Sequence, residues 1–241
     1  MDNELLLLSN NDIPFVEAQI NIHQPRIKEI ALIGEESFFA GCQFLNFNKF
    51  QLSEKDRVGL EDKSDFNILM SIMCGKEKMH YKYDAIMVLS LLFPQHKIQF
   101  KNNEIFLLSE ANMSRINEQN YDTFKDILVN MFVLSDNEHM IGQYNPADKR
   151  AAKIAERLQN RKKKSGNNEK KKVAIFSRYI SVLAVGEKKD INSLMDYTVY
   201  QLKDEFERFQ KKQNFDFNMK ARLAGATDLE DVDNWMEDIH P

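Results

Sequence analysis

The chain has 241 residues, of which 43% are hydrophobic and 29% charged, so it can bury a core of ordinary globular composition. The formal net charge of −4 excludes a uniformly basic nucleic-acid-binding protein, and no apolar run approaches the ~20 residues that a membrane helix requires. Eight glycines and five prolines favour long helices over many short strands joined by tight turns.

The start of the chain and its two cysteines favour a location in the cytoplasm. The N-terminal stretch ELLLLS is too short and too acidic for a signal peptide. Cys42 and Cys74 form no C-x-x-C pair, which favours two buried thiols in a reducing cytosol. We therefore expect a soluble cytoplasmic protein.

The first predicted elements form a joint between a strand and a helix. Residues 12–22 alternate loosely between apolar and polar, which predicts one or two short strand segments. Pro25 disfavours helix in the residue before it and suits the first turn of a helix that follows. We expect that helix to end at Gly34 in a left-handed conformation, and a second helix to cover residues 35–47.

Further elements up to residue 132 are predicted from caps and from the hydrophobic period. They are a helix from Ser53, a helix from Ser64 or Asp65 to Gly75, a helix over 83–93 that is apolar on nearly every side, a hairpin over 97–108 that turns at Asn102-Asn103, and a helix from Asn117 or Asn120 to Phe132. The helix over 83–93 is expected to be buried all round.

A basic joint is predicted after residue 144. Asn145 and Pro146 mark a helix start, and between Lys149 and Lys172 eleven basic residues face two acidic ones, a net +9 on a chain of −4. We therefore predict a mostly α fold in three parts. These are an α+β N-terminal module over 1–144 with a short strand and a hairpin, a basic linker helix over 145–172, and a helical C-terminal module over 173–241.

The densest basic positions of the linker are Arg161, Lys162, Lys163, Lys164, Lys170, Lys171 and Lys172. A solvated linker helix is the favoured interpretation, with a docking surface for an acidic protein as one alternative. Nucleic acid is a second, disfavoured alternative, because the run lacks interleaved aromatic side chains for stacking.

The C-terminal module is predicted to be helical throughout. One helix covers 173–185, and a second runs from Asp190 or Asn192 to about Ala224, followed by a Gly225 stop and a last acidic helix. The seam of the second helix is Met195, Val199, Leu202, Phe206 and Phe209. In the last helix, Val232 and Met236 surround Trp235 as a small apolar anchor, which either packs on its own domain or inserts into a partner groove.

No pattern in the chain indicates catalysis or a cofactor. The five histidines stand singly, without an i, i+4 partner or a neighbouring cysteine, so we expect no metal site. The acidic residues near the C-terminus do not match a calcium-binding loop, and no G-x-S-x-G or phosphate-loop motif occurs. We expect a protein that is not an enzyme and carries no cofactor.

Two stretches resemble a known family. INIHQPRIKEIALIGEESFFAGC, residues 20–42, is similar to the N-terminal signature of the tail and baseplate assembly chaperones of tailed phages from Gram-positive hosts, in which a strand leads into Q-P-x-I-x-E-I-x-x-I-G-E. ARLAGATDLEDVDNWMEDIH, residues 221–240, is similar to the C-terminal segment of the same group. Together they cover opposite ends of the chain.

The resemblance implies a non-enzymatic assembly factor of the host cytoplasm. Such proteins bind tail, hub or tape-measure proteins as monomers or small oligomers, and shield exposed apolar surface until polymerisation. The implied partner-binding residues are Gln24, Pro25, Ile27, Glu29, Ile30, Gly34 and Glu35 in the first stretch, with Leu229, Val232, Trp235 and Met236 in the last. Many tail chaperones are shorter than this chain, which leaves open a structural baseplate or tail subunit of the virion.

Overall fold

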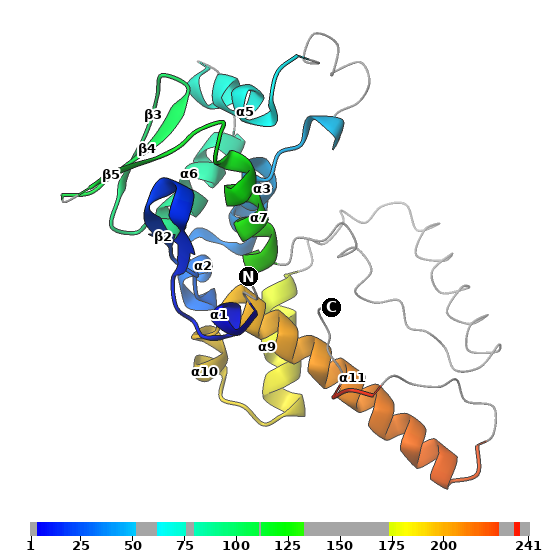
Figure 1. Ribbon diagram of the computed structural model, residues 1–241. Coiled ribbons are helices and arrows are strands. Elements are labelled where there is room, and N and C mark those ends of the chain that lie inside the picture. Colours follow the sequence, from blue (N-terminus) through cyan, green and yellow to red (C-terminus); the bar gives the residue numbers. More distant parts are fainter. Residues whose placement is uncertain are drawn as a thin grey trace, which may run out of the picture. The chain divides into compact units, whose positions relative to one another are not determined.

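The computed structural model describes residues 4–51, 62–75, 80–110, 112–132, 174–226 and 234–236 (Figure 1). Its helices are α1 Glu4–Leu8, α2 Ile27–Ile33, α3 Glu35–Leu45, α5 Asp65–Cys74, α6 His80–Leu92, α7 Tyr121–Phe132, α9 Ile175–Gly186, α10 Ile191–Met195 and α11 Val199–Leu223, with short 3-10 turns at Val16–Ala18 and Lys49–Gln51. The strands are β1 Ile13–Phe15, β2 Ile20–Ile22, β3 Lys97–Lys101, β4 Glu104–Leu108 and β5 Met113–Ile116. The predicted class, mostly α with small strand elements, is confirmed.

The chain divides into two compact units. Unit 1 comprises Met1–Leu134 and Ile180–Leu202, and unit 2 comprises Ser135–Tyr179 and Lys203–Pro241. The segment 173–241, taken as one module from the sequence, thus contributes to both units. The predicted boundaries at 144 and 172, the basic linker between them and the helix from Ser53 lie outside the described residues, so these stay predictions.

The predicted strand segments form an antiparallel hairpin, β1–β2. Ile13 pairs with Ile22 and Phe15 with Ile20, and a 3-10 turn with Gln19 at φ 53° joins the two strands. Ile13, Phe15 and Ile22 are buried, so the apolar residues of the alternating pattern face one core. The backbone N–H of His23 donates to the carbonyl of Leu92 at 2.9 Å, which attaches the end of β2 to α6.

A second sheet has the order β3-β4-β5, all antiparallel. Asn102 and Asn103 turn between β3 and β4 with φ of 52° and 59°, as expected for asparagine in a two-residue hairpin loop. The sequence did not predict β5, which is only four residues long. Its Ile116 pairs with Ile105 of β4 and is fully buried, so the strand completes the inner face of the sheet.

Aromatic rings on α7 connect the core of unit 1. Phe124 lies 6.0 Å from Phe15 of β1 and 6.3 Å from Phe93 after α6, between ring centroids. At the two ends of α7, Tyr121 contacts Phe66 of α5 and Phe132 contacts Phe38 of α3, each at 5.0 Å. The hydroxyl of Tyr121 donates to the carbonyl of Leu45 at 2.8 Å, so its one polar atom is satisfied in the core.

Helices α3 and α6 approach each other closely at Gly41. A Cβ added at Gly41 would lie 2.5 Å from the carbonyl oxygen of Asp84 and 2.6 Å from Cγ2 of Val88. Only glycine therefore allows this approach of the two backbones. Beside it Cys42 is fully buried, which raises the pKa of its thiol, whereas Cys74 at the end of α5 is exposed, contrary to the expectation of two buried thiols.

Glycines end two helices as the sequence predicted. Gly34 has φ 88° and separates α2 from α3, although its ψ of 142° is extended and not that of a left-handed helix. Gly225 has φ 95°, and the N–H groups of Gly225 and Ala226 donate to the carbonyls of Arg222 and Ala221 at 3.0 Å. This is the Schellman pattern, which satisfies the last carbonyls of α11.

The predicted single helix from Asp190 to Ala224 is wrong, because Asp196–Thr198 interrupt it. Asp190 caps the short α10 by accepting the N–H of Ser193 at 3.1 Å, and α11 starts afresh at Val199. The seam of Met195, Val199 and Leu202 has a continuous helical period, so the interruption is not visible in the hydrophobic pattern. Its cause lies in contacts with the N-terminal motif, described below.

Gly41→Ala tests the close approach of α3 and α6. An added methyl group overlaps the backbone of α6, so we expect the free energy of unfolding, measured by urea denaturation, to fall by about 1–3 kcal/mol. Helix propensity alone predicts the opposite sign, a gain of about 1 kcal/mol for alanine over glycine. A variant more stable than the wild type would therefore contradict the close approach.

Gly75→Ala is the matched control. Gly75 has φ −62°, and the nearest atom to its added Cβ is the Ser71 carbonyl oxygen at 3.1 Å. We expect this substitution to change the stability by less than about 0.5 kcal/mol.

Candidate functional site

The Q-P-x-I-x-E-I stretch is held inside unit 1. Gln24, Pro25, Ile27 and Ile30 are all buried, with Gln24 only 2% exposed. The side-chain amide of Gln24 donates to the carbonyl of Leu6 at 3.2 Å and to that of Asn11 at 2.6 Å. One amide thus connects α1 and the turn before β1 to the segment that leads into α2.

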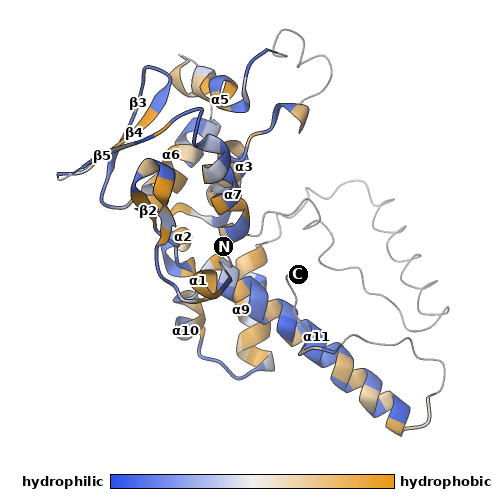
Figure 2. Cartoon of the chain, in the orientation of Figure 1, coloured by the Kyte–Doolittle hydropathy of each residue, from blue (hydrophilic) through white to orange (hydrophobic). Residues whose placement is uncertain are grey.

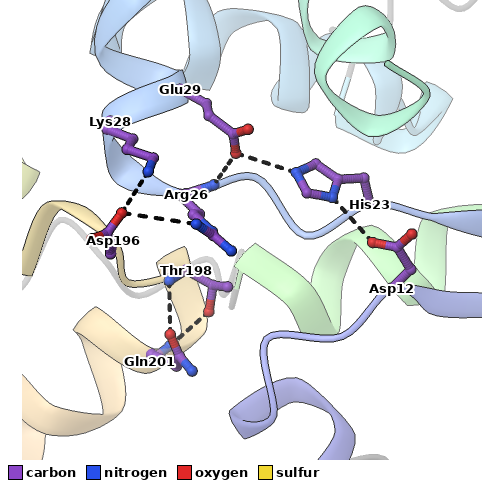
Figure 3. A network of polar contacts seen from close by, with 8 residues as sticks. All are labelled: Asp12, His23, Arg26, Lys28, Glu29, Asp196, Thr198 and Gln201. Carbon is purple, nitrogen blue, oxygen red and sulfur yellow. Dashed lines mark hydrogen bonds and ion pairs between the residues drawn. The ribbon is translucent and has the colours of Figure 1, made fainter. Parts of the chain in front are cut away.

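A chain of polar contacts runs from the hairpin to α2 (Figure 3). Nδ1 of His23 lies 3.0 Å from Oδ1 of Asp12, and its Nε2 lies 3.2 Å from Oε2 of Glu29. The same oxygen of Glu29 accepts the backbone N–H of Arg26 at 2.7 Å, so the carboxylate also caps α2.

Asp196, in the break between α10 and α11, faces the same motif. Its Oδ1 lies 2.6 Å from Nζ of Lys28 and 3.8 Å from Nη1 of Arg26 (Figure 3). The hydrogen bond and charge of Lys28, and then the charge of Arg26, hold the pKa of the Asp196 carboxyl below its usual value. The backbone adds a hydrogen bond at 2.9 Å from Ile27 to the carbonyl of Tyr197, and a bridge between Arg26 and Thr198.

Thr198 and Gln201 restart the helix after the break. The N–H of Gln201 donates to Oγ1 of Thr198 at 3.2 Å, and the N–H of Thr198 donates to Oε1 of Gln201 at 2.9 Å, which is a reciprocal capping box. Nε2 of Gln201 donates further to the carbonyl of Leu8 at 2.7 Å. The T-x-x-Q spacing was a local signal for this helix start that the sequence analysis missed.

These contacts join α1, the first hairpin, α2 and the start of α11 into one polar cluster, which we call the N-terminal clasp. It comprises Asp12, His23, Gln24, Arg26, Lys28, Glu29, Asp196, Thr198 and Gln201. The family-like residues Gln24, Pro25, Ile27, Glu29 and Ile30 have internal contacts or burial here, and Gly34 and Glu35 are half-buried. A partner-binding role for them stays a prediction.

An exposed apolar face lies on α6, where the sequence predicted burial on every side. Ala85, Val88, Leu89 and Leu92 are buried, but Tyr83, Ile86 and Met87 are 56%, 37% and 43% exposed. The three exposed residues follow the i, i+3, i+4 spacing of one helix face, so they are neighbours. We call them the α6 face. Polar His80 and Ser90, at the same helical phase, were the sequence signal for exposure.

A second exposed set lies on the C-terminal half of α11. No described residue after Phe206 is buried, although apolar and polar residues alternate along the whole helix (Figure 2). Phe217, Met219 and Leu223 are 64%, 43% and 85% exposed. With the exposed Lys220 and Arg222 they form the distal α11 surface, which occupies about the last two turns of the helix.

The other predicted site residues are only partly described. Leu229, Val232 and the basic linker residues lie outside the described residues. Trp235 is half-buried and Met236 is exposed, and with Asn234 they form a turn. The rest of the predicted last helix lies outside the described residues. The side chain of Asn234 accepts the N–H of Met236 at 3.1 Å, which accounts for this local turn.

Several ionisable groups in the described ranges form structural pairs. Lys125 contacts Asp65 at 3.3 Å and Asp122 at 2.9 Å, and burial, followed by the charge of Asp65, raises the pKa of Tyr121. Within the described part of the chain, no group of three His, Cys, Asp or Glu side chains could hold a metal ion. None of the helices described there has the length and apolar character needed to cross a membrane.

Comparison with known proteins adds one match. A family model described as the YomV second domain matches residues 166–240, under a third of the 241 residues. The matched segment contains α9, α10 and α11. The name of this family is phage-derived, so the match suggests a phage protein. No curated protein and no solved structure matches the chain.

Gln24→Met tests whether the motif acts within the fold. The substitution keeps the side-chain length and removes both amide hydrogen bonds, so we expect the free energy of unfolding to fall by about 1–3 kcal/mol in a denaturant titration. Gln99→Met, on an exposed position of β3, is the control and should be neutral. Unchanged stability combined with loss of a protein partner would instead place Gln24 in a binding surface.

Proposed function

We propose that this protein is a non-enzymatic assembly chaperone for a phage tail or baseplate, and that it binds a tail, hub or tape-measure protein. The observation that carries the proposal is the α6 face, Tyr83, Ile86 and Met87, on a helix whose opposite side is already buried. Contiguous apolar side chains exposed on a folded protein mark surfaces for other molecules more often than isolated ones do.

The α6 face is suited to cover apolar surface on a client. Its orientation is set by the α3–α6 contact at Gly41, so its side chains need little ordering when a client binds. Helix faces with anchors at i, i+3 and i+4 commonly pack into or against apolar grooves. Burial of these side chains supplies affinity in proportion to the area removed from water, about 25 cal/mol per Å².

Two further observations support a phage assembly role. The stretches at residues 20–42 and 221–240 resemble tail and baseplate assembly chaperones, and the family match over 166–240 is phage-derived. The proposal also takes the protein to perform no chemical step. In support, the polar side chains of the N-terminal clasp are engaged with one another and with backbone groups, which gives them a structural role.

Co-expression with the tail, hub and tape-measure proteins of the same phage tests the proposal. We expect the wild type to co-purify with one of them, and the double variant Ile86→Ser, Met87→Ser to retain at least about tenfold less, because two apolar anchors are lost. The matched control is Ile191→Ser, Met113→Ser, at exposed positions of α10 and β5. Equal recovery with both double variants would remove the α6 face from the proposal.

The composition of purified virions distinguishes the chaperone from its alternatives. A chaperone is absent from finished particles, whereas a structural baseplate or tail subunit is present at fixed stoichiometry. A nucleic-acid-binding protein would instead lose its retention on DNA steeply with salt, and deletion of residues 161–172 would abolish it.

A further inference from the structure

We propose that the distal α11 surface, formed by Phe217, Met219, Lys220, Arg222 and Leu223, binds an acidic amphipathic segment of a protein partner. The proposal rests on the proposed function only in assigning that segment to a phage tail protein. The binding chemistry follows from α11 itself, which lies beyond residue 202 in unit 2.

Among the described residues, Phe217, Met219 and Leu223 of α11 are exposed; at about 100° per residue Met219 and Leu223 share one side of the helix, and Phe217 lies about 160° around it from Met219. Met219 and Leu223 are one helical turn apart, and Lys220 lies three residues from both Phe217 and Leu223. The first half of α11 is different, because Phe206 is buried and stacks on Tyr179 of α9 with 3.9 Å between ring centroids. The helix is thus anchored at its start and presents Phe217 and Leu223 near its end.

The charges around these anchors are mostly basic. Residues 207–223 hold five basic and two acidic side chains, a net +3 on a chain whose total is −4. Arg208 is paired with Asp204 at 3.2 Å and Lys212 with Asp216 at 3.0 Å. Within the described part of the chain, Lys211 and Lys220 have no acidic group within 4.0 Å. An acidic segment would complement this charge and be steered by it.

A second α11 helix fits the surface poorly. Antiparallel pairing of two α11 helices would bring Lys220 and Arg222 of one copy towards Lys211 and Lys212 of the other. Like charges at a helix contact are destabilising, so an acidic partner is favoured over pairing of two α11 helices.

Nucleic acid and a membrane surface also fit less well. The surface has a single aromatic ring, and the side chains of Met219 and Leu223 do not stack on bases as aromatic rings do. The exposed apolar residues span only positions 217–223, about 10 Å of helix at 1.5 Å per residue. Interfacial membrane helices present a longer apolar face, often over 20–30 residues.

Fluorescence anisotropy with synthetic peptides tests the proposal on the full-length protein. The probe is a labelled 14-residue amphipathic peptide with leucines at i, i+3, i+4 and i+7 and glutamates elsewhere. We expect saturable binding to the wild type that weakens as NaCl is raised from 50 to 500 mM. Peptides with lysine for glutamate, or with serine for leucine, should bind at least about tenfold more weakly.

Two pairs of variants locate the binding. Leu223→Ser and Lys220→Glu should each weaken the acidic peptide about tenfold, because one removes an apolar anchor and the other reverses a central charge. Leu32→Ser on α2, at 87% exposure against 85% for Leu223, is the apolar control, and Lys101→Glu on β3 is the charge control. Equal affinity in all four variants, or no binding by the wild type, would overturn the proposal.

The same variants distinguish an acidic peptide from other ligands, and failure of the distal α11 surface from failure of the proposed function. The protein could instead bind a 20-mer oligothymidylate or phosphatidylglycerol vesicles more tightly than the acidic peptide. If Lys220→Glu abolishes that binding, the surface belongs to nucleic acid or membrane and the proposal is overturned. If the wild type captures a tail protein and Leu223→Ser captures it equally, the distal α11 surface fails while the chaperone function stands. If peptide binding holds but no tail protein is captured, the chaperone function fails alone.

Discussion

The close approach of α3 and α6 at Gly41 is the constraint on which the functional account of unit 1 depends. Because no side chain separates the two backbones there, the inner residues of α6, including Val88, are fixed against α3. The side of α6 that turns outward is thereby fixed as well. A helix with apolar residues on both sides then buries one set and exposes the other. The exposed Tyr83, Ile86 and Met87 follow from a packing contact on the opposite side of the same helix.

Elements governed by local chemistry could be predicted from the sequence. Gly34 ends α2 as expected, Asn102 and Asn103 adopt the positive φ of a hairpin turn, and Ser64 caps α5 by accepting the N–H of Asn67. Pro25, expected in the first turn of α2, lies one residue before the N-cap Arg26. Features that depend on distant residues could not. The break at Asp196–Thr198 follows from contacts with Arg26 and Lys28, and the hydrophobic seam runs through it without a signal.

The candidate site differs from the expectation for a related reason. The resemblance to a family signature led us to expect that Gln24 and Glu29 bind a partner, yet both form hydrogen bonds within the N-terminal clasp. Residues with strict geometric demands, such as a buried amide with two carbonyl partners, produce recognisable motifs because of folding alone. The α6 face and the distal α11 surface consist of ordinary apolar side chains, whose exposure depends on tertiary packing. Sequence patterns therefore marked the clasp and missed both surfaces.

The central claim is that this protein keeps apolar surface of a phage tail protein from aggregating. The solubility of the tape-measure protein, expressed with and without this chain, tests that claim most directly. The account predicts that the tape-measure protein moves from the pellet to the soluble fraction in a complex of fixed stoichiometry, and that serines at positions 86 and 87 reduce this shift. An unchanged soluble fraction, both for the tape-measure protein and for the tail and hub proteins of the same phage, would contradict it.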